Sequence, residues 1–358
     1  MTAESAAHFP RVDLTVAGAG MAGLVAAARA RQLGARVNVV EKGDRPGGSM
    51  LLSSCVPWRH VDWDEFRREC PGGDERLQGL IWSRLDEALD WLERTAHVEP
   101  VWRDTNNPRT TGRRYEPTAL TAGLVASIGP DRLSLSAGSD VDVHRHQAPL
   151  VLATGGFPVR FARERGLLVR SNPWSEGDGL DHARARGAAT AGDLTEVYAR
   201  AMPAAPATVG ERDFVGLSQL YGGRARVLGE EGEEFFPGPP AWHENDLAQA
   251  IARRPGGTAW FELDEPADPA VAAARAAGGT VVEEDGRVRV HVIAGITHTL
   301  GGLRVDERTR VVREDGTPIG GLYAAGVDVG GVASGGYASG LAQALVLGLV
   351  AAESALRE

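Results

Sequence analysis

The chain has 358 residues, which is enough for one large domain or two of ordinary size. It is 43% hydrophobic and 24% charged, a globular composition, and its formal net charge of −10 disfavours nucleic acid or an anionic membrane surface as a partner. The two cysteines, Cys55 and Cys70, indicate no disulfide framework, and no CxxC or CxxCH segment offers ligands for haem or an iron–sulfur cluster.

No targeting segment is visible. The N-terminus lacks both the apolar core of a signal peptide and a twin arginine, so we expect a cytoplasmic protein. The longest apolar stretch near the C-terminus, between Gln343 and Glu353, is too short to span a bilayer. No His, Cys and Asp spacing predicts a metal site.

A G-x-G-x-x-G turn follows the first predicted strand. Val12 to Ala17 is mostly apolar and β-prone, which predicts a buried parallel strand, and Gly18-Ala19-Gly20-Met21-Ala22-Gly23 comes directly after it. In such a turn the first glycine permits the bend and the second lets the backbone approach a pyrophosphate. The third allows close packing of helix on strand. The Ala-rich helix predicted from Leu24 to Leu33 then directs free N–H groups at the phosphates.

A second strand, predicted from Ala35 to Val40, ends at Glu41. A carboxylate here, 18 residues after Gly23, suits the 2′-hydroxyl of an adenosine ribose and repels a 2′-phosphate. Because strand, turn, helix, second strand and terminal Glu occur together, we predict a dinucleotide-binding domain rather than a tight turn without a ligand.

The middle of the chain differs in character from both ends. Polar, Gly/Pro-rich stretches alternate with Ala-rich helices from about residue 161 to residue 290, which is typical of an inserted α+β cap. After Gly295 the chain is Gly-rich and apolar again. The remaining predicted elements are helices over Leu77–Thr95, Pro117–Ile128, Asp246–Arg253, Asp268–Ala277 and Ser339–Leu356, a strand starting at Leu133 and a strand over Ala148–Ala153.

Four segments occur in an order that resembles a known family. They are LVLATGGF, SEGDGLDHARARGAA, AGITHTLGGLRVD and IGGLYAAGVDVGGVASGGYASGLAQALVLGLVAA. Together with the N-terminal turn they resemble the fumarate reductase/3-ketosteroid dehydrogenase class of FAD enzymes, closest to its ketosteroid-type and tricarballylate-dehydrogenase-like branches. The resemblance implies a Rossmann-like α/β FAD-binding domain, with a parallel sheet, helices and a small antiparallel layer, interrupted by a capping domain. We expect FAD-binding parts at residues 1–157 and 293–358, a capping domain at 158–292, and the active site where they meet.

The resemblance also implies a set of cofactor contacts. The stretch from Glu41 to Ser49 matches the family's Glu…GG-S segment, and the last glycine of GLYAAG is followed by Val327 where the family has Glu or Asn, so Asp328 is the expected substitute. No histidine lies between Gly47 and Ser54, where membrane succinate dehydrogenases attach flavin covalently, so we predict non-covalent FAD. The predicted cofactor-binding residues are Gly18, Gly20, Met21, Ala22, Gly23, Glu41, Lys42, Gly48, Ser49, Ala153, Thr154, Gly155, Asp178, Gly326, Asp328, Gly340 and Leu341.

Two residues are the catalytic candidates. His298 matches the family's H-T-x-G-G loop, whose histidine contacts a substrate carboxylate in fumarate reductases. The position of a catalytic arginine in fumarate reductases corresponds, by spacing from GLYAAG, to Tyr337. This departure disfavours fumarate reduction and resembles the ketosteroid-type and tricarballylate-type branches.

The activity implied is the addition or removal of hydrogen across a C–C bond activated by a neighbouring carbonyl or carboxylate, with hydride passing through flavin N5 and a proton through Tyr337 or His298. Free Tyr has a pKa of about 10, so a Tyr base needs a lowered pKa whereas a Tyr proton donor does not. The substrate is expected to be a small molecule, and the electron partner stays open. So do three alternatives: a flavin oxidase that uses oxygen, a flavin hydroxylase, whose usual GD-x-A-H segment is replaced by GLYAAG, and a non-redox flavin isomerase.

Other side chains are weaker candidates for the pocket. Trp58, Arg59 and His60 follow the flavin loop and are candidates for its wall. Weaker cap candidates are Tyr198, Arg200, Tyr221 and Arg226. His243 and His291 are expected to be ordinary surface or strand residues.

Overall fold

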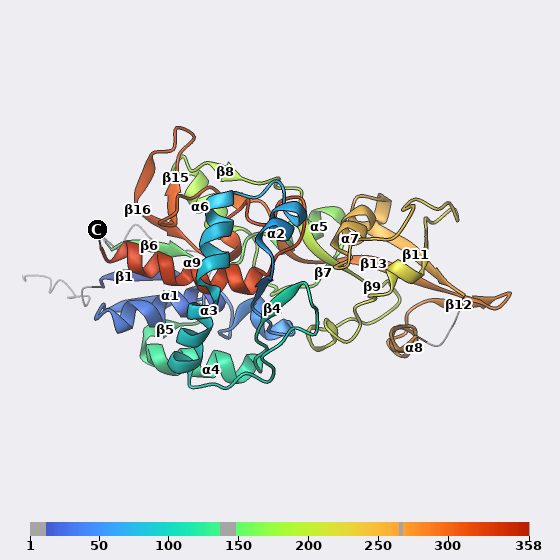
Figure 1. Ribbon diagram of the computed structural model, residues 1–358, viewed down its shortest axis with the longest axis horizontal. Coiled ribbons are helices and arrows are strands. Elements are labelled where there is room, and N and C mark those ends of the chain that lie inside the picture. Colours follow the sequence, from blue (N-terminus) through green and yellow to red (C-terminus); the bar gives the residue numbers. More distant parts are fainter. Residues whose placement is uncertain (1–11, 137–147, 265–267, 358) are drawn as a thin grey trace, which may run out of the picture.

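The computed structural model describes residues 12–136, 148–264 and 268–357. Residues 1–11, 137–147, 265–267 and 358, which belong to the three predicted domains, lie outside the described residues. Figure 1 shows an elongated molecule in which one β-sheet lies among helices at one end and a second sheet extends toward the other end.

The first sheet is built from both ends of the chain. Its strand order is β15 (Arg310–Val312), β16 (Pro318–Ala324), β6 (Leu150–Leu152), β1 (Leu14–Ala17), β2 (Val37–Val40) and β5 (Leu133–Ser134). Strand β1 pairs in parallel with β2 and β6, β16 pairs in parallel with β6, and only β15 joins antiparallel. All four residues of β1 are buried, as expected for a central parallel strand. The predicted fold class, a parallel α/β sheet completed by the C-terminal segment, is confirmed.

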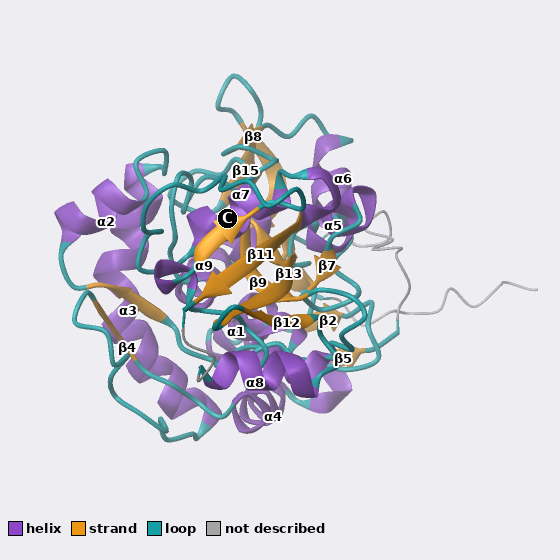
Figure 2. Cartoon of the chain, turned by 90° about the vertical axis from the view of Figure 1, so that its right-hand side faces the viewer, coloured by secondary structure: helices purple, strands orange, loops and turns teal. Residues whose placement is uncertain are grey.

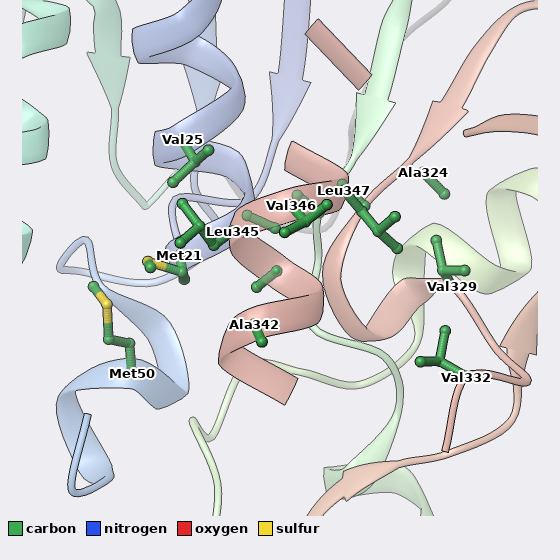
Figure 3. Close-up of a cluster of buried hydrophobic side chains, with 14 of the residues drawn as sticks. Met21, Val25, Met50, Ala324, Val329, Val332, Ala342, Leu345, Val346 and Leu347 are labelled. Carbon is green, nitrogen blue, oxygen red and sulfur yellow. The ribbon is translucent and has the colours of Figure 1, made fainter. Parts of the chain in front are cut away.

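Helices cover this sheet. The described helices are α1 (Met21–Gln32), α2 (Trp63–Glu69), α3 (Glu75–Ala96), α4 (Pro117–Ile128), α5 (Pro158–Arg165), α6 (Asp178–Arg184), α7 (Asn245–Ala252), α8 (Pro269–Ala276) and α9 (Gly340–Ala355). Helix α1 packs against α4 and α9, and α3 also packs against α4 and α9. Figure 3 shows Ala342, Leu345 and Val346 of α9 among buried apolar side chains that include Met21 and Val25 of α1. This packing fixes where the N-terminus of α9 points.

The second sheet forms the cap. Its path is β10 (Arg226–Leu228), β11 (Thr258–Leu263), β13 (Arg287–Thr299) and β12 (Val281–Glu284). The C-terminal half of β13 also pairs in parallel with β7 (Leu168–Val169) and antiparallel with β9 (Val197–Pro203). Figure 2 shows β9, β11 and β13 side by side at the cap end of the molecule. Smaller pairs are β3 (Trp58–His60) with β4 (Thr110–Gly112), and β14 (Gly302–Leu303) with β8 (Thr190–Ala191).

The predicted helices agree with the observed ones to within three residues at each end, and the one over Pro117–Ile128 coincides with α4. The largest difference is in the cap, where the sequence analysis did not anticipate β9, β11 or the 13-residue strand β13. Strand β13 runs through residues 292 and 293, where the sequence analysis placed a domain boundary, and it delivers Thr297 and His298 from the cap toward the first sheet. The division into three segments stays a prediction.

Candidate active site

A large cavity lies along the carboxyl ends of the parallel strands and continues under the cap. One end of it is lined by Ala17, the last residue of β1, and by the residues that directly follow β2, β6 and β16, which are Glu41, Ala153 and Ala325. Ligands of open α/β sheets bind at this edge, because the strand ends and the helix N-termini that follow them meet there. The cavity therefore begins where the sequence predicts a dinucleotide and ends among cap residues.

The three glycines of the turn differ in the space that an added Cβ atom would find, in agreement with the role predicted for each. A Cβ on Gly18, whose φ is +100°, would lie 2.2 Å from the carbonyl oxygen of Ala153, and one on Gly23 would lie 1.9 Å from that of Gly18. A Cβ on Gly20 would have nothing within 4 Å. Gly20 is also the N-cap of α1, where no side chain caps the free N–H groups. The open space and the uncapped N–H groups fit a pyrophosphate at this helix N-terminus.

The Glu41 carboxylate is buried and lines the cavity. Its two oxygens accept the backbone N–H groups of Ala19 and Gly43, each at 2.7 Å. These bonds hold the carboxylate between the glycine turn and the next loop, while remaining lone pairs are available to a ribose hydroxyl. Glu41 thus has a structural role that the sequence pattern did not reveal.

The next residues that line the nucleotide end are tied together by polar contacts. The Lys42 ammonium donates to Glu176 at 2.6 Å and to Asp178 at 3.0 Å, and the Ser49 hydroxyl accepts the backbone N–H of Asn172 at 3.0 Å. These contacts connect the loop after β2 with the loop before α6. The cofactor half of the cavity is therefore built by segments more than a hundred residues apart in sequence.

Most of the predicted cofactor-binding residues line the cavity. Those that do are Gly18, Gly20, Met21, Ala22, Glu41, Lys42, Gly48, Ser49, Ala153, Thr154, Gly155, Asp178, Gly326, Gly340 and Leu341. Gly23 and Asp328 are not among them. Burial raises the pKa of the Asp328 carboxyl, which accepts the Thr154 hydroxyl at 2.8 Å and the Gly155 N–H at 3.0 Å. Val327 lines the cavity instead, so Asp328 orders the wall from behind.

Helix α9 begins at the cavity. Ser339 caps it by accepting the backbone N–H of Ala342 at 3.2 Å, and Gly340 and Leu341 of the first turn line the cavity. Free N–H groups at such an end favour negative charge. The turn therefore offers electrostatic stabilisation to a group bound beside it.

Tyr337 stands in an aromatic cluster on the wall. Its ring stacks on Tyr198 with centroids 4.7 Å apart and lies 5.1 Å from Trp58. The two tyrosine hydroxyls are 3.4 Å apart. Burial strongly raises the pKa of Tyr337, so its hydroxyl keeps its proton at neutral pH. The arrangement gives the cavity a hydroxyl that donates a hydrogen bond.

His298 also lies in the cavity, directly beside the start of α9. Burial lowers the pKa of His298 to about 4, so the imidazole is neutral at pH 7. Its Nδ1–H donates to the Thr299 carbonyl at 3.2 Å, which leaves Nε2 as an acceptor. A Cβ on Gly340 would lie 3.1 Å from this Nε2. In this tautomer the ring accepts a hydrogen bond, so a carboxylate gains no donor from it.

The cap contributes cationic and polar side chains to the same cavity. Arg170, Arg200, Ser218 and Thr297 line it together with the apolar Val215. The sequence analysis considered Arg200 only as a weak candidate and missed Arg170. The signal for Arg170 was its place in RSNP, five residues before the SEGDG segment.

Several weaker candidates lie elsewhere. Trp58 lines the cavity, whereas Arg59 pairs with Asp86 and His60 is buried behind the wall. Tyr221 belongs to the cap core and Arg226 pairs with Glu262 on β11. His291 is a strand residue, as expected.

The expectation for His243 was wrong. It is buried, its Nε2 lies 3.2 Å from a Glu69 oxygen, and its ring lies 5.3 Å from that of Tyr337. The cap loop folds back onto the end of α2, which a sequence without its tertiary contacts does not show.

The chain belongs to a family of FAD-binding proteins. The model of an FAD binding domain matches residues 122–341, and a model of an NAD(P)-binding Rossmann-like domain matches residues 16–54. The predicted FAD-binding family is confirmed, with FAD as its cofactor. The predicted resemblance to fumarate reductases and 3-ketosteroid dehydrogenases is found again among the relatives and the similar folds.

Individual relatives are distant. The chain is 23% identical to the NADH:fumarate oxidoreductase of Klebsiella pneumoniae (strain 342), over 96% of this chain and 48% of that protein, so it spans about half the length of this relative. Its fold is similar to 3-ketosteroid-Δ4-(5α)-dehydrogenase from Rhodococcus jostii RHA1, with a TM-score of 0.69 at 19% identity, covering 100% of this chain and 99% of that one. The 3-ketosteroid Δ1-dehydrogenase from Sterolibacterium denitrificans is similar too, with a TM-score of 0.69 at 16% identity, covering 98% and 100%.

Within residues 12–136, 148–264 and 268–357, no group of three or more His, Cys, Asp or Glu side chains is arranged to hold a metal ion. No helix in these ranges is long and apolar enough to cross a membrane.

Proposed function

We propose that this protein adds or removes hydrogen across a C–C bond next to a carbonyl or carboxylate of a small-molecule substrate. The observation that carries the proposal is the continuity of the cavity. It joins the glycine turn and Glu41 at one end to the Tyr337 hydroxyl and the cap arginines at the other. A nucleotide at the first end leaves a space at the second in which a substrate meets a proton donor.

FAD, when bound, supplies the hydride acceptor or donor for such a reaction. The protein's own part is to hold the substrate and to move the proton. Burial raises the pKa of Tyr337, so its hydroxyl carries a proton for the reductive direction at neutral pH but is a weaker acid than a free tyrosine. The transfer therefore needs the phenolate that forms to be stabilised, and the Arg200 guanidinium, which lies 5.4 Å from the ring centroid, supplies positive charge for this. Acting as a base in the oxidative direction, it first has to lose that stabilised proton. The structure therefore favours Tyr337 as a donor or relay.

The walls of the cavity support this chemistry by orientation and by excluding water. Trp58 and Tyr198 flank the Tyr337 ring and offer flat surfaces for an unsaturated substrate. Gly340 and Leu341 of the first turn of α9 also line the cavity, and the free N–H groups of this turn suit negative charge that develops on a carbonyl oxygen. His298 completes the wall as a neutral hydrogen-bond acceptor.

The proposal includes non-covalent attachment of FAD. Cys55 is the cysteine in the cavity wall, and burial raises its pKa to about 12, so its thiol is not an available nucleophile. No histidine occurs between Gly47 and Ser54. Acid precipitation of the holoprotein should release all the flavin into the supernatant, and flavin remaining in the pellet would contradict this part.

The proposed activity is tested by mixing the yellow holoprotein anaerobically with carbonyl and carboxylic acid compounds that have adjacent CH–CH bonds. Bleaching of the flavin absorbance, with formation of the unsaturated product, supports it. Hydrogen peroxide formation in air at the rate of substrate turnover would favour the oxidase alternative. Isomerised product without any bleaching would favour the non-redox alternative.

Two parts of the proposal concern the protein's surroundings. The electron donor or acceptor stays open, and the given 358 residues contain no CxxC or CxxCH segment that would hold a haem or an iron–sulfur cluster. The cytoplasmic location remains a prediction from the N-terminal residues, which cell fractionation tests directly.

A further inference from the structure

Two arginines face the substrate end of the cavity without an acidic partner. Arg170 and Arg200 both line the cavity. Within the described residues, neither of these two guanidinium groups has a carboxylate oxygen within 4.0 Å. The ion pairs that other arginines form with carboxylates, such as Arg29 with Glu353 and Arg226 with Glu262, lie outside this part of the cavity. The cavity wall therefore carries two guanidinium groups outside any ion pair of the described residues, and the only carboxylate that acts on either of them is Glu244, on Arg200 and from beyond ion-pair distance.

The two side chains lie on the same face of β13. Arg200 on β9 is paired with Gly295 in the antiparallel register, so its side chain stands on the face to which a Gly295 side chain would point. A Cβ built on Gly295 would lie 3.3 Å from both Cβ and Cδ of Arg170. Arg170 therefore extends across the strand at the glycine, and the missing side chain makes room for it. This geometry brings together two arginines that are thirty residues apart in sequence.

Neutral groups hold the Arg170 guanidinium in position. It donates to the Phe214 carbonyl at 2.8 and 3.1 Å, to the Thr297 hydroxyl at 2.8 Å and to the Ser218 hydroxyl at 3.2 Å. Arg170 as a whole is 9% exposed, and this burial lowers the pKa of its guanidinium. These contacts fix the orientation of the group but leave its charge uncompensated, which is costly in a buried place. An anionic ligand relieves that cost.

The Arg200 guanidinium, like that of Arg170, is held by a neutral backbone carbonyl. It donates to the His243 carbonyl, and its guanidinium lies 4.8 Å from the Tyr198 ring centroid and 5.4 Å from that of Tyr337. Planar guanidinium groups bind carboxylates through parallel N–H donors. Arg200 therefore places its guanidinium beside the rings of both tyrosines, in the same cavity as Arg170.

The mouth of the same cavity is apolar. Val215 and Leu220 line it and are 50% and 53% exposed. Exposed apolar side chains at a pocket mouth fit a ligand that is itself apolar there. The only lysine of the chain, Lys42, lies at the nucleotide end and is paired with Glu176 and Asp178. The cavity thus combines one cationic corner with an aromatic and aliphatic wall.

We propose that the substrate carries a single carboxylate on an otherwise apolar skeleton, and that Arg170 and Arg200 bind this carboxylate while Val215 and Leu220 contact the skeleton. This rests on the proposed function in that it names the substrate class of the same cavity. Such a substrate differs from a dicarboxylate, which needs a second group of cationic side chains in the cavity. It also differs from a neutral carbonyl compound, which leaves the charges of both arginines without a counter-charge.

The test measures binding to the oxidised holoprotein by titration calorimetry, with benzoate and benzamide as probes of equal shape and different charge. Wild type should bind benzoate at least about tenfold more tightly than benzamide. A hydrogen bond to a charged group contributes roughly 1.5–3 kcal/mol, and 1.4 kcal/mol is a factor of ten. Arg200→Met and Arg170→Met should therefore each weaken benzoate binding about tenfold to a hundredfold and leave benzamide nearly unchanged.

Controls separate binding from folding. Arg31→Met removes the same charge from an exposed position on α1 and should bind benzoate like wild type. Because Arg170 also holds the Phe214 loop, Arg170→Lys serves as a second variant that keeps the charge but not the planar fork. A folded Arg170→Lys protein should lose less affinity for benzoate than Arg170→Met.

Three results would overturn the inference. Equal affinity of wild type for benzoate and benzamide would show that the arginines bind no anion. Weaker FAD binding in both arginine variants, with benzoate affinity unchanged, would assign the charges to the cofactor. Fumarate binding as tightly as benzoate would replace the apolar skeleton by a dicarboxylate. None of these measurements requires turnover, so a failed substrate screen contradicts the proposed function and not the anion site.

Discussion

The FAD-binding part and the cap shape the two ends of one cavity by different means. At the nucleotide end the backbone forms the surface: Gly18, Gly20 and the start of α1 present N–H groups, and added side chains would collide or block the space. At the cap end side chains form the surface, and Gly295 is there to let Arg170 pass over the strand. The absence of a side chain on glycine thus leaves room for a ligand at the nucleotide end and room for the Arg170 side chain at the cap end.

This difference teaches which part of the site is general and which is particular to this protein. A backbone surface recognises a pyrophosphate wherever the turn recurs, because N–H groups are the same in every sequence. A side-chain surface depends on which residues adjacent strands bring together. Substitutions at the nucleotide end should therefore change FAD binding and leave the substrate reaction nearly unchanged. Substitutions at the cap end should change substrate binding or chemistry and leave FAD binding nearly unchanged.

The largest effect is expected at the cap end, for the chemical step. Tyr337→Phe keeps the stacked ring and removes the hydroxyl, so flavin reduction or reoxidation with the true substrate should slow about 10²–10⁴-fold, with FAD affinity unchanged. Stopped-flow absorbance under anaerobic conditions measures the step. Tyr221→Phe is the matched control, because that hydroxyl donates to Gln219 in the cap core, away from the cavity. A wild-type rate for Tyr337→Phe across pH would leave Tyr337 only a wall residue.

At the nucleotide end the expected effect is on affinity. Glu41→Ala should weaken FAD binding about tenfold to a hundredfold, since a hydrogen bond to a carboxylate contributes roughly 1.5–3 kcal/mol. It should also lower the melting temperature of the apoprotein, because the N–H groups of Ala19 and Gly43 lose their acceptor. Turnover should recover at saturating FAD. Glu75→Ala, at an exposed position on α3, is the control, and turnover that stays low with excess FAD would contradict a purely binding role.

A third substitution separates the two uses of glycine. Gly295→Ala places a Cβ 2.7 Å from Met202 Cγ and 3.3 Å from Arg170, so overpacking should destabilise the protein by about 1–3 kcal/mol and weaken benzoate binding. FAD affinity should stay near the wild-type value. Gly320→Ala, on β16 with nothing within 4 Å of the added atom, is the control. Unfolding in urea with parallel flavin titration measures both quantities, and a loss of FAD affinity alone would contradict the separation.

The smallest effect concerns the pH dependence of stability. An unfolded histidine has a pKa of about 6.5, whereas burial lowers that of His298 to about 4. Between these values the unfolded chain binds more protons, so the stability that His298 contributes is complete above about pH 6.5 and is lost as the pH falls toward 4. Between about pH 7 and pH 5 the loss due to this residue should be about 1–2 kcal/mol.

His298→Gln should flatten this part of the stability profile, measured by urea unfolding at a series of pH values. His97→Asn is the control, since His97 is exposed and its left-handed φ of +53° is one that Asn tolerates. A slope that is the same in wild type and His298→Gln would mean that folding leaves the pKa of His298 at its unfolded value.

Local sequence determined three features of the nucleotide end of this protein. The turn at Gly18 to Gly23, the carboxylate at Glu41 and the start of α9 after Ser339 follow from backbone conformation and capping, which depend on residues a few positions apart. These features were predictable because each is complete within one short segment. The position of Asp328, behind the cavity wall and not in it, was not predictable, since it depends on a hydrogen bond to Thr154, which lies in the loop after β6.

The tertiary structure alone decided the substrate end. Arg170 directly follows β7, and Arg200 lies on β9. These two strands flank β13 on opposite sides, and only the register of that sheet places both arginines over Gly295. His243 became a buried neighbour of Tyr337 because a cap loop folds onto Glu69 of α2. Sequence spacing cannot supply such pairings, because they are set by which distant strands and loops share a surface, and their free energy arises only when both partners are desolvated together.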